Sequence, residues 1–418
     1  MKINYKSVLP KIAFLSALIS IVCMYYVVVN KDAFLRYAIF LFGFYGMILV
    51  CRRARARNKT EIFTIYAVLI LGIFLLQLFK FSHAKASTSR LLMNYLPALL
   101  MVIFSCNEES SITFIKLYRL MSILLACSIF ISVIIPSLFS SSLSFLFKPA
   151  VLAAINKEIG NGVYSGFVGE KAYAAHLLAV GCGIEIAMLF DSETKLLNKK
   201  RLMTIVFYLA ATMLTGKRTL FVVLLGILFL AFLISEYKQK AIKLVPYIMG
   251  SIIALILIVN FVPQAQIVLL RLLETEDLTT GNGRIYFWET AFQMFKNNKA
   301  MGYGLGGYMD YQERFASTNG FNAHNSYIQL IGESGIIGCS VFFSMFAVSL
   351  IVAIHRVYKY KTQIARMCLY IILISLLYAT TGNVMHSFSQ FFVYYFALNI
   401  LQIGLDQEDL DYYLSKRR

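Results

Sequence analysis

The chain has 418 residues, of which 59% are hydrophobic and 14% charged. Soluble domains carry about 25% charged residues, so this composition excludes an ordinary soluble protein. The net charge of +18 lies in short loops between apolar stretches and not in a basic soluble domain. This distribution argues against a nucleic-acid-binding protein and agrees with positive-inside membrane topology.

Apolar windows of membrane-spanning length recur along the chain and predict an all-α integral membrane protein, because lipid cannot satisfy the backbone of an open sheet. The N-terminal stretch resembles a signal peptide but lacks a clear cleavage site, so we interpret it as an uncleaved first helix. Twelve spans fit, near residues 12–29, 33–50, 62–79, 91–105, 114–135, 172–190, 202–215, 219–235, 244–262, 335–354, 367–380 and 391–404.

The orientation follows from the short basic loops, which favour the cytoplasmic side. With twelve spans and the N-terminus inside, the basic segments 51–59, 195–201, 236–243 and 355–366 all fall on that side, as does the tail. The predicted organisation is a nine-span bundle (1–262), a large extracytoplasmic loop between the ninth and tenth spans (263–334), C-terminal spans (335–404) and a cytoplasmic tail (405–418). A second outer connection covers 136–171.

Polar residues open the sixth predicted span, in "GFVGEKAYAAHLL". We expect Glu170 and Lys171 to pair at its outer mouth. His176 lies about one turn further in, where it is either a packed histidine of the bundle or a substrate contact.

Two basic residues, Lys217 and Arg218, fall on the predicted outer face in "LTGKRTLF". This position runs against the positive-inside bias, so a functional role is considered by default. The arginine fork suits a phosphate group, since it donates two parallel hydrogen bonds. Contact with lipid headgroups is the alternative interpretation.

The large outer loop contains "GNGRIYFWETAFQMF", which starts at Gly281 and includes the single tryptophan of the chain. Asn282 or Gly283 can start a helix here. The pattern then places apolar side chains near one face, as in an interfacial helix with a tryptophan at headgroup depth; these are Ile285, Trp288, Phe292 and Phe295. Arg284 would stand at the helix start, facing the bundle mouth or, alternatively, solvent.

The segment "GYGLGGY" (302–308) satisfies the spacing GxGxxG. The dinucleotide-binding interpretation is rejected, because that fingerprint requires a strand before it and a helix after it. A turn that allows close backbone approach is expected instead.

"FNAHNSYIQLIGESGIIG" (321–338) ends the loop. Asn325 or Ser326 can cap a helix that begins at Tyr327, and Gly332, Gly335 and Gly338 form a small-residue face. His324 would therefore sit at a rigid helix start, where an imidazole can accept a proton near neutral pH or serve only as a cap or hydrogen-bonding group. His386 also falls on the outer side and carries less weight.

No metal-binding motif is visible: the sequence has no HExxH, no DxD and no CxxC among its seven cysteines. Arg218, Arg284 and His324 come from three separate outer segments. Two arginines and a histidine indicate anion capture next to proton transfer, without a metal or a cofactor.

The sequence resembles the O-antigen ligase and polymerase family of bacterial surface-polysaccharide assembly. "LTGKR" is similar to the family's arginine at the outer end of a middle span, "GNGRIYFWETAFQMFKNNKAMGYGLGGY" to its arginine–tryptophan helix and glycine turn, and "HNSYIQLIGESGIIG" to its His-Asn helix start. Three departures stand out: Lys217 replaces a serine, Asn298-Lys299 replaces an Asn-Pro pair, and Glu170-Lys171 stands where an asparagine is usual.

The resemblance implies a glycosyltransferase of the bacterial cytoplasmic membrane that takes a glycan from a polyprenyl-diphosphate carrier and passes it to an acceptor sugar hydroxyl at the outer face. Arg218 and Arg284 would bind the diphosphate and His324 would act as general base; Lys217, Asn325, Trp288, Lys171 and His176 would contact substrate. A chain-length regulator and a flippase are further expected partners. Polymerisation of repeat units is preferred; ligation to lipid A core or another acceptor, a lipid-linked oligosaccharide flippase and a structural scaffold are the alternatives.

Overall fold

The computed structural model describes residues 61–80, 84–104, 108–142, 147, 149–189, 198–234, 266, 284–315 and 322–404. Within these ranges every regular element is helical. The predicted spans 12–29, 33–50 and 244–262 and the tail 405–418 lie outside the described residues. The prediction of an all-α membrane protein is confirmed, and the exact count of twelve spans stays a prediction.

The described elements, in chain order, are α3 (Ile62–Lys80), α4 (Lys85–Phe104), α5 (Glu108–Ile134), α6 (Pro136–Ser142), α7 (Pro149–Gly160), η2 (Gly166–Val168), α8 (Lys171–Leu189), α9 (Lys199–Leu214), α10 (Arg218–Leu233), α14 (Arg284–Asn297), α15 (Tyr308–Phe315), α16 (Ser326–Tyr360), α17 (Gln363–Tyr378), η4 (Val384–His386) and α18 (Phe388–Ile403). Five described helices are long and apolar enough to cross a membrane: α3, α4, residues 111–134 of α5, α8 and α16. The shorter apolar helices α10, α17 and α18 complete the bundle.

Helix α8 is the centre of the described bundle. It is buried over almost its whole length from Ala174 to Leu189, and it packs against α5, α9, α10 and α17. A helix that is apolar on all sides is typical of a protein core or a membrane span, and α8 is surrounded by other helices. Glycines permit the close approach, since a Cβ at Gly181 would lie 2.8 Å from Ser122 and one at Gly183 would lie 2.9 Å from Ile374.

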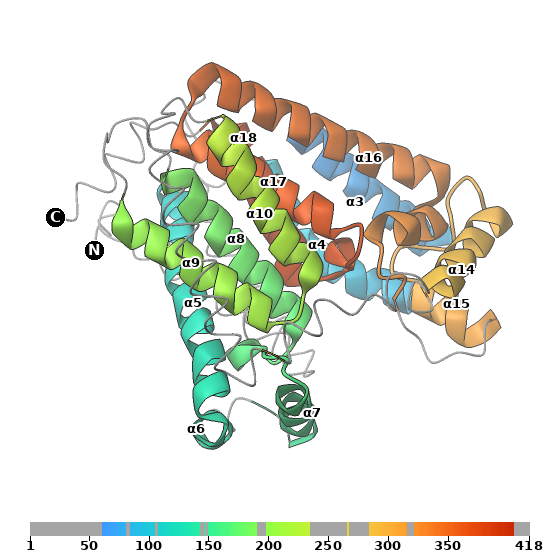
Figure 1. The fold of residues 1–418 in the computed structure, drawn as a ribbon. Coiled ribbons are helices and arrows are strands. Elements are labelled where there is room, and N and C mark those ends of the chain that lie inside the picture. The colour runs from blue at the N-terminus through green and yellow to red at the C-terminus, as the bar shows by residue number, and fades with distance from the viewer. Residues whose placement is uncertain are drawn as a thin grey trace, which may run out of the picture.

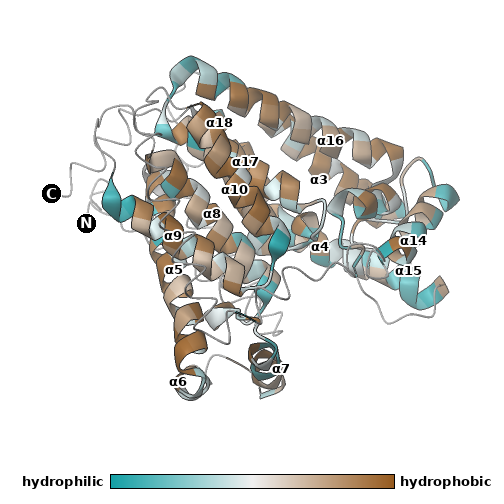
Figure 2. Cartoon of the chain, in the orientation of Figure 1, coloured by the Kyte–Doolittle hydropathy of each residue, from teal (hydrophilic) through white to brown (hydrophobic). Residues whose placement is uncertain are grey.

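The two ends of the bundle differ in character. Helices α8, α10 and α16 all begin at the end that carries α14 and α15, which we call the α14 end (Figure 1). The hydropathy colouring shows apolar bundle helices and a more polar α14–α15 pair (Figure 2). The basic segments 199–201 and 355–361 start α9 and end α16, so both lie at the opposite end, as the predicted topology requires.

A buried carboxylate ties three helices together near that opposite end. The Glu185 side chain of α8 is 2% exposed, and it pairs with Arg119 of α5 at 2.6 Å and Arg201 of α9 at 3.4 Å. A charge in an apolar interior is tolerated when it is paired in this way.

Several predicted boundaries were wrong in detail. The connection 136–171 contains the helices α6 and α7, which the sequence pattern did not reveal. Helix α5 already begins at Glu108, ahead of the predicted span 114–135, whereas α16 begins at Ser326, close to the helix start predicted at Tyr327. The start of the predicted tenth span nevertheless coincides with a break, because Gly335 has non-helical backbone angles (φ 61°, ψ −164°) inside α16.

The loop elements form a small core of their own beside the start of α16. Its buried and partly buried members are Ala291, Met294, Tyr308, Tyr311, Ala323, Phe287, Trp288, Tyr303 and Ile328. The described part of helix α14 runs over Arg284–Asn297, and its apolar, membrane-facing side stays a prediction. Ile285 and Phe292 are 55% and 44% exposed, while Ala291 and Met294 face the protein.

Candidate active site

His324 occupies the sharp turn that leads into α16. Asn325 is the N-cap, and its Oδ1 accepts hydrogen bonds from the backbone N–H groups of Tyr327 (3.0 Å) and Ile328 (3.1 Å). The predicted cap is therefore confirmed. His324 itself has a positive φ of 52°, a conformation that non-glycine residues adopt rarely and usually where tertiary structure enforces it. Its side chain is exposed at the α14 end.

Trp288 supports the backbone beside this histidine. Its indole Nε1 donates a hydrogen bond of 3.1 Å to the carbonyl of Ala323, which directly precedes His324. The ring is half-buried against the loop core, and its expected position at membrane-headgroup depth stays a prediction. Trp288 thus anchors the non-helical segment that carries His324.

Positive charges from two other elements converge on the imidazole. Partial removal from water lowers the pKa of His324, and the charges of Lys217 and Arg284 lower this pKa further. Lys217 is the N-cap residue of α10 and Arg284 the first residue of α14. Three sequence-predicted residues from distant segments therefore share one electrostatic environment. A lowered pKa keeps the imidazole neutral, the form that accepts a proton.

Lys217 is half-buried and feels charges of both signs. Burial lowers its pKa first, Glu170 opposes this shift, and Lys171 and Arg284 add to it. Arg218 follows directly as the first residue of α10 and is also half-buried. The start of α10 therefore presents two cationic side chains to the α14 end.

The expected pairing of Glu170 with Lys171 was wrong. The Lys171 Nζ instead lies 2.9 Å from Oε1 of Glu158 in α7, with both side chains about one-third exposed. The Glu170 carboxylate accepts a hydrogen bond of 2.8 Å from the backbone N–H of Tyr173, so it caps the first turn of α8. Local competition for the helix N-terminus explains why adjacent opposite charges do not pair.

His176 lies deeper than the other candidates. It is fully buried in α8 and its ring stacks on Tyr378 with centroids 5.9 Å apart. Neither ring nitrogen has a hydrogen-bond partner in the described part of the chain. The charges of Glu170 and Arg284 act on Tyr378. Tyr378 therefore lies between His176 and these charged residues.

The glycine turn (302–308) forms backbone hydrogen bonds with α16 next to its break at Gly335. The N–H groups of Tyr303 and Gly304 donate to the carbonyls of Gly332 (3.0 Å) and Glu333 (2.9 Å). In return, two N–H groups freed by the break, those of residues 336 and 337, donate to the carbonyls of residues 299 and 300, just before the turn, at 2.8 and 3.0 Å. A Cβ at Gly302 would lie 2.4 Å from the Glu333 carbonyl carbon, so the close approach expected of this turn is confirmed.

Glu333 was not predicted as a site residue from the sequence, and His386 was given little weight. Glu333 is fully buried, and its Oε2 lies 2.7 Å from Nε2 of His386. The available signal was a carboxylate within an apolar, glycine-rich stretch, which in a membrane protein indicates a specific partner.

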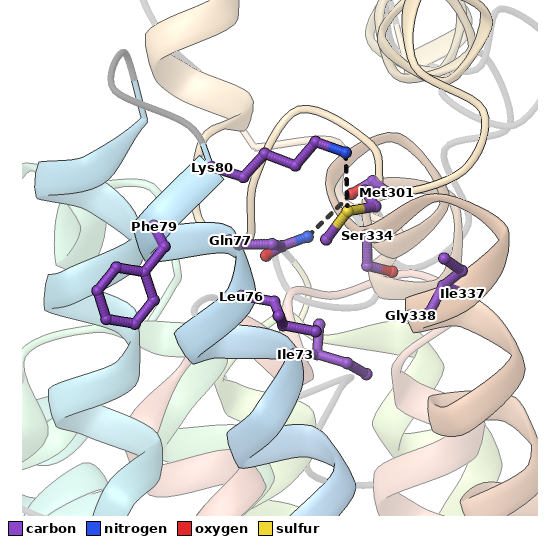
Figure 3. Close-up of a pocket in the computed structure, with 9 residues that line it drawn as sticks. All are labelled: Ile73, Leu76, Gln77, Phe79, Lys80, Met301, Ser334, Ile337 and Gly338. Atoms are coloured by element: carbon purple, nitrogen blue, oxygen red, sulfur yellow. Dashed lines mark hydrogen bonds between the residues drawn. The ribbon is translucent and has the colours of Figure 1, made fainter.

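An apolar groove runs between α3 and the part of α16 that follows the break, with a volume of about 430 Å³. Ile73 and Leu76 form one wall and Ile337 the other, while Lys80 reaches across the rim towards Met301 (Figure 3). Its lining suits a hydrocarbon chain better than a sugar.

The described residues contain no group of three or more His, Cys, Asp or Glu side chains that could hold a metal ion. They define an integral, all-helical membrane protein with a cationic cluster beside His324 at one end of the bundle. Residues 203–343 match the family model described as O-antigen ligase. A search among curated proteins finds no match.

The chain thus carries an O-antigen ligase family domain, and the resemblance stated from the sequence is confirmed over these residues. The similarity to this family covers residues 203–343, which is less than half of the chain. The matched segment includes Lys217, Arg218, Arg284, Trp288 and His324 together with Asn325. Lys171 and His176 lie before it.

Proposed function

We propose that the chain is a metal-independent, inverting glycosyltransferase that polymerises polyprenyl-diphosphate-linked repeat units at the outer face of the bacterial cytoplasmic membrane. The observation that supports this most directly is the convergence of Lys217 and Arg284 on His324, which lies at a capped helix start. An anion site beside a neutral base suits the transfer of a sugar from a diphosphate.

The reaction is a single displacement. The acceptor hydroxyl oxygen attacks the anomeric carbon, and the bond from that carbon to the diphosphate oxygen breaks with its electron pair. His324 takes the hydroxyl proton as the new carbon–oxygen bond forms, and later releases it to solvent. Arg218 and Arg284 bind the diphosphate and stabilise its developing charge, with Lys217 as a third cation. Attack from the face opposite the leaving group inverts the anomeric configuration.

The apolar groove suits the hydrocarbon tail of a second lipid-anchored substrate. It is built by α3 and the later part of α16, whereas the cationic cluster is built by the starts of α8, α10 and α14 and the turn before α16. A polymerase handles two lipid-linked substrates, so it needs a second path for a hydrocarbon tail. We assign the groove to the isoprenoid chain of the acceptor, with Lys80 at the rim complementing its diphosphate.

The function is tested by deleting the gene and separating surface polysaccharide by size on a gel. Loss of the long-chain ladder, with one-repeat material still attached to the surface, supports polymerisation. Loss of all attached glycan, with full-length polymer stranded on its lipid carrier, assigns ligation instead. Single repeat units stranded at the cytoplasmic face would point to a flippase and would remove the proposed role of His324.

A further inference from the structure

The carboxylate of Glu333 is an organising centre at the α14 end. It is fully buried and accepts hydrogen bonds from the backbone N–H groups of Gly306 (2.9 Å) and Tyr308 (3.2 Å). The Gln329 amide donates at 3.0 Å and the imidazole of His386 lies at 2.7 Å. Four partners from three elements fix the carboxylate, and it in turn fixes the ring of His386.

This contact determines which nitrogen of His386 is free to act. A carboxylate only accepts hydrogen bonds, so Nε2 carries the proton in the pair with Glu333. When Nε2 carries the only ring proton, Nδ1 is an acceptor whose lone pair is unused. That atom is buried and has no hydrogen-bond partner among the described residues, and the side chain of His386 is 8% exposed.

A second unpartnered acceptor stands on the same turn. The Oδ1 of Asn383 is buried without a partner in the described chain. Asn383 precedes the 3-10 turn η4 and His386 ends it, and the His386 N–H donates to the Asn383 carbonyl at 2.9 Å. Side chains three residues apart on such a turn lie on the same side. Two acceptors therefore lack a donor within one short loop.

The loop is fastened to the helix start that follows His324. The N–H of Ser326 donates to the carbonyls of Ala379 (2.8 Å) and Gly382 (3.2 Å). Its hydroxyl donates to Gly382 at 2.9 Å and accepts from the N–H of Met385 at 3.3 Å. Ser326 lies two positions after His324 in the chain, so the unpartnered acceptors neighbour the proposed base.

We infer that Asn383 and His386 form a subsite for the hydroxyl groups of a sugar ring, with Glu333 holding His386 in the accepting orientation. Buried acceptors without donors cost free energy, and a polyol supplies O–H donors that remove this cost on binding. The inference rests on the proposed function and names two residues for glycan recognition beside the reacting centre. The subsite lies on the loop between α17 and α18, outside the family-matched segment.

Two substitutions of His386 separate substrate binding from structural support. His386→Gln places an amide nitrogen near the Nε2 position, so it keeps the contact with Glu333 but has no atom in place of Nδ1. His386→Asn places an oxygen near the Nδ1 position and leaves Glu333 without that partner. If His386 has only a structural role, His386→Asn should be less stable and less active than His386→Gln. If His386 binds a hydroxyl group, His386→Gln should have the higher KM.

The assay uses the full-length protein in nanodiscs and, as substrate, the lipid-linked oligosaccharide that accumulates in a strain lacking the gene. His386→Gln is expected to raise KM for this substrate about tenfold, the size of one lost hydrogen bond, with a smaller change in kcat. Asn383→Leu is expected to act in the same direction, whereas Asn383→Asp keeps an acceptor oxygen and a KM near that of the wild type. Thr380→Ala, on the exposed part of the same loop, is the matched control.

Unchanged KM in both His386→Gln and Asn383→Leu would mean that water alone occupies the acceptors, and this would overturn the inference while leaving the polymerase standing. If His386→Gln does not fold, the comparison of Asn383→Leu with Asn383→Asp decides the question. A wild-type protein that forms no polymer from this substrate would remove the proposed function and the subsite together.

Discussion

The indole of Trp288 holds the carbonyl of Ala323 at 3.1 Å, one residue before the strained backbone of His324. Helix α14 thereby contributes in two ways, since its first residue supplies a positive charge and its second turn anchors the histidine. These two contributions to one site explain why Arg284 and Trp288 occur together near the start of α14.

Trp288→Phe tests this anchoring. Phenylalanine retains the packing in the loop core but loses the donor, which is worth about 1 kcal/mol. We expect kcat to fall about fivefold to tenfold, because the lost hydrogen bond leaves the backbone before His324 less firmly held and His324 less well placed. KM should change less. Phe292→Leu on the exposed face of α14 is the control, and equal kinetics in the two variants would contradict the anchoring role.

Lys217 is expected to set the pH dependence of the reaction. The pKa of His324 is lowered by partial desolvation and by the charges of Lys217 and Arg284. Lys217→Met removes one of these charges, so the pKa of His324 rises and the imidazole is protonated at a higher pH. Because only the neutral form accepts a proton, the acidic limb of the kcat/KM profile should move to higher pH.

The matched control for this shift is Lys296→Met, at the far end of α14. It should leave the acidic limb where it is. A profile of Lys217→Met that superimposes on the wild type would show that the titrating group on this limb is not His324.

The glycine turn and the break in α16 are expected to be intolerant of side chains. Gly335 has a φ of 61°, and a Cβ there would lie 2.5 Å from the Gly302 nitrogen. Gly335→Ala should therefore destabilise the protein by about 2 kcal/mol or more, combining backbone strain with overpacking. Gly226→Ala in α10, where a Cβ meets nothing within 4 Å, should be neutral or slightly stabilising. Thermal unfolding in detergent measures the stability of both variants. Equal unfolding midpoints would contradict the tight packing of the glycine turn against the break in α16.

Filling the groove between α3 and α16 should hinder the lipid-linked acceptor. Ile337 lines the groove and is 49% exposed, whereas its neighbour Ile336 is 58% exposed and does not line it. Ile337→Trp is expected to raise KM for the acceptor several-fold, and Ile336→Trp to leave it unchanged, in a polymerisation assay with varied substrate concentration. The same KM in both variants would argue that the acceptor chain runs elsewhere.

Local rules predicted some parts of the site and long-range contacts determined the rest. The Asn325 cap follows from nearest-neighbour chemistry, so the sequence was sufficient for it. The contacts of α14 with the protein were not predicted, because they join this helix to residues distant in the chain. Trp288 illustrates this, since its partner Ala323 lies 35 positions further along the chain.

The Glu333–His386 pair shows the limit more clearly. The two residues are 53 positions apart and belong to different elements, so no spacing rule connects them. The pair also depends on the break at Gly335 and on the glycine turn that supplies N–H groups to the carboxylate. The twelve-span layout, by contrast, was predicted from hydropathy alone, and the described helices α3, α4, α8 and α16 agree with it.

The role of His324 is tested most directly by single-turnover polymerisation with the full-length His324→Ala protein, alongside a separate measurement of substrate binding. Loss of a general base predicts a rate at least about 100-fold below the wild type with binding retained. His355→Ala, which changes an exposed histidine near the other end of α16, should react at the wild-type rate. A His324→Ala protein that forms polymer as fast as the wild type would contradict the account.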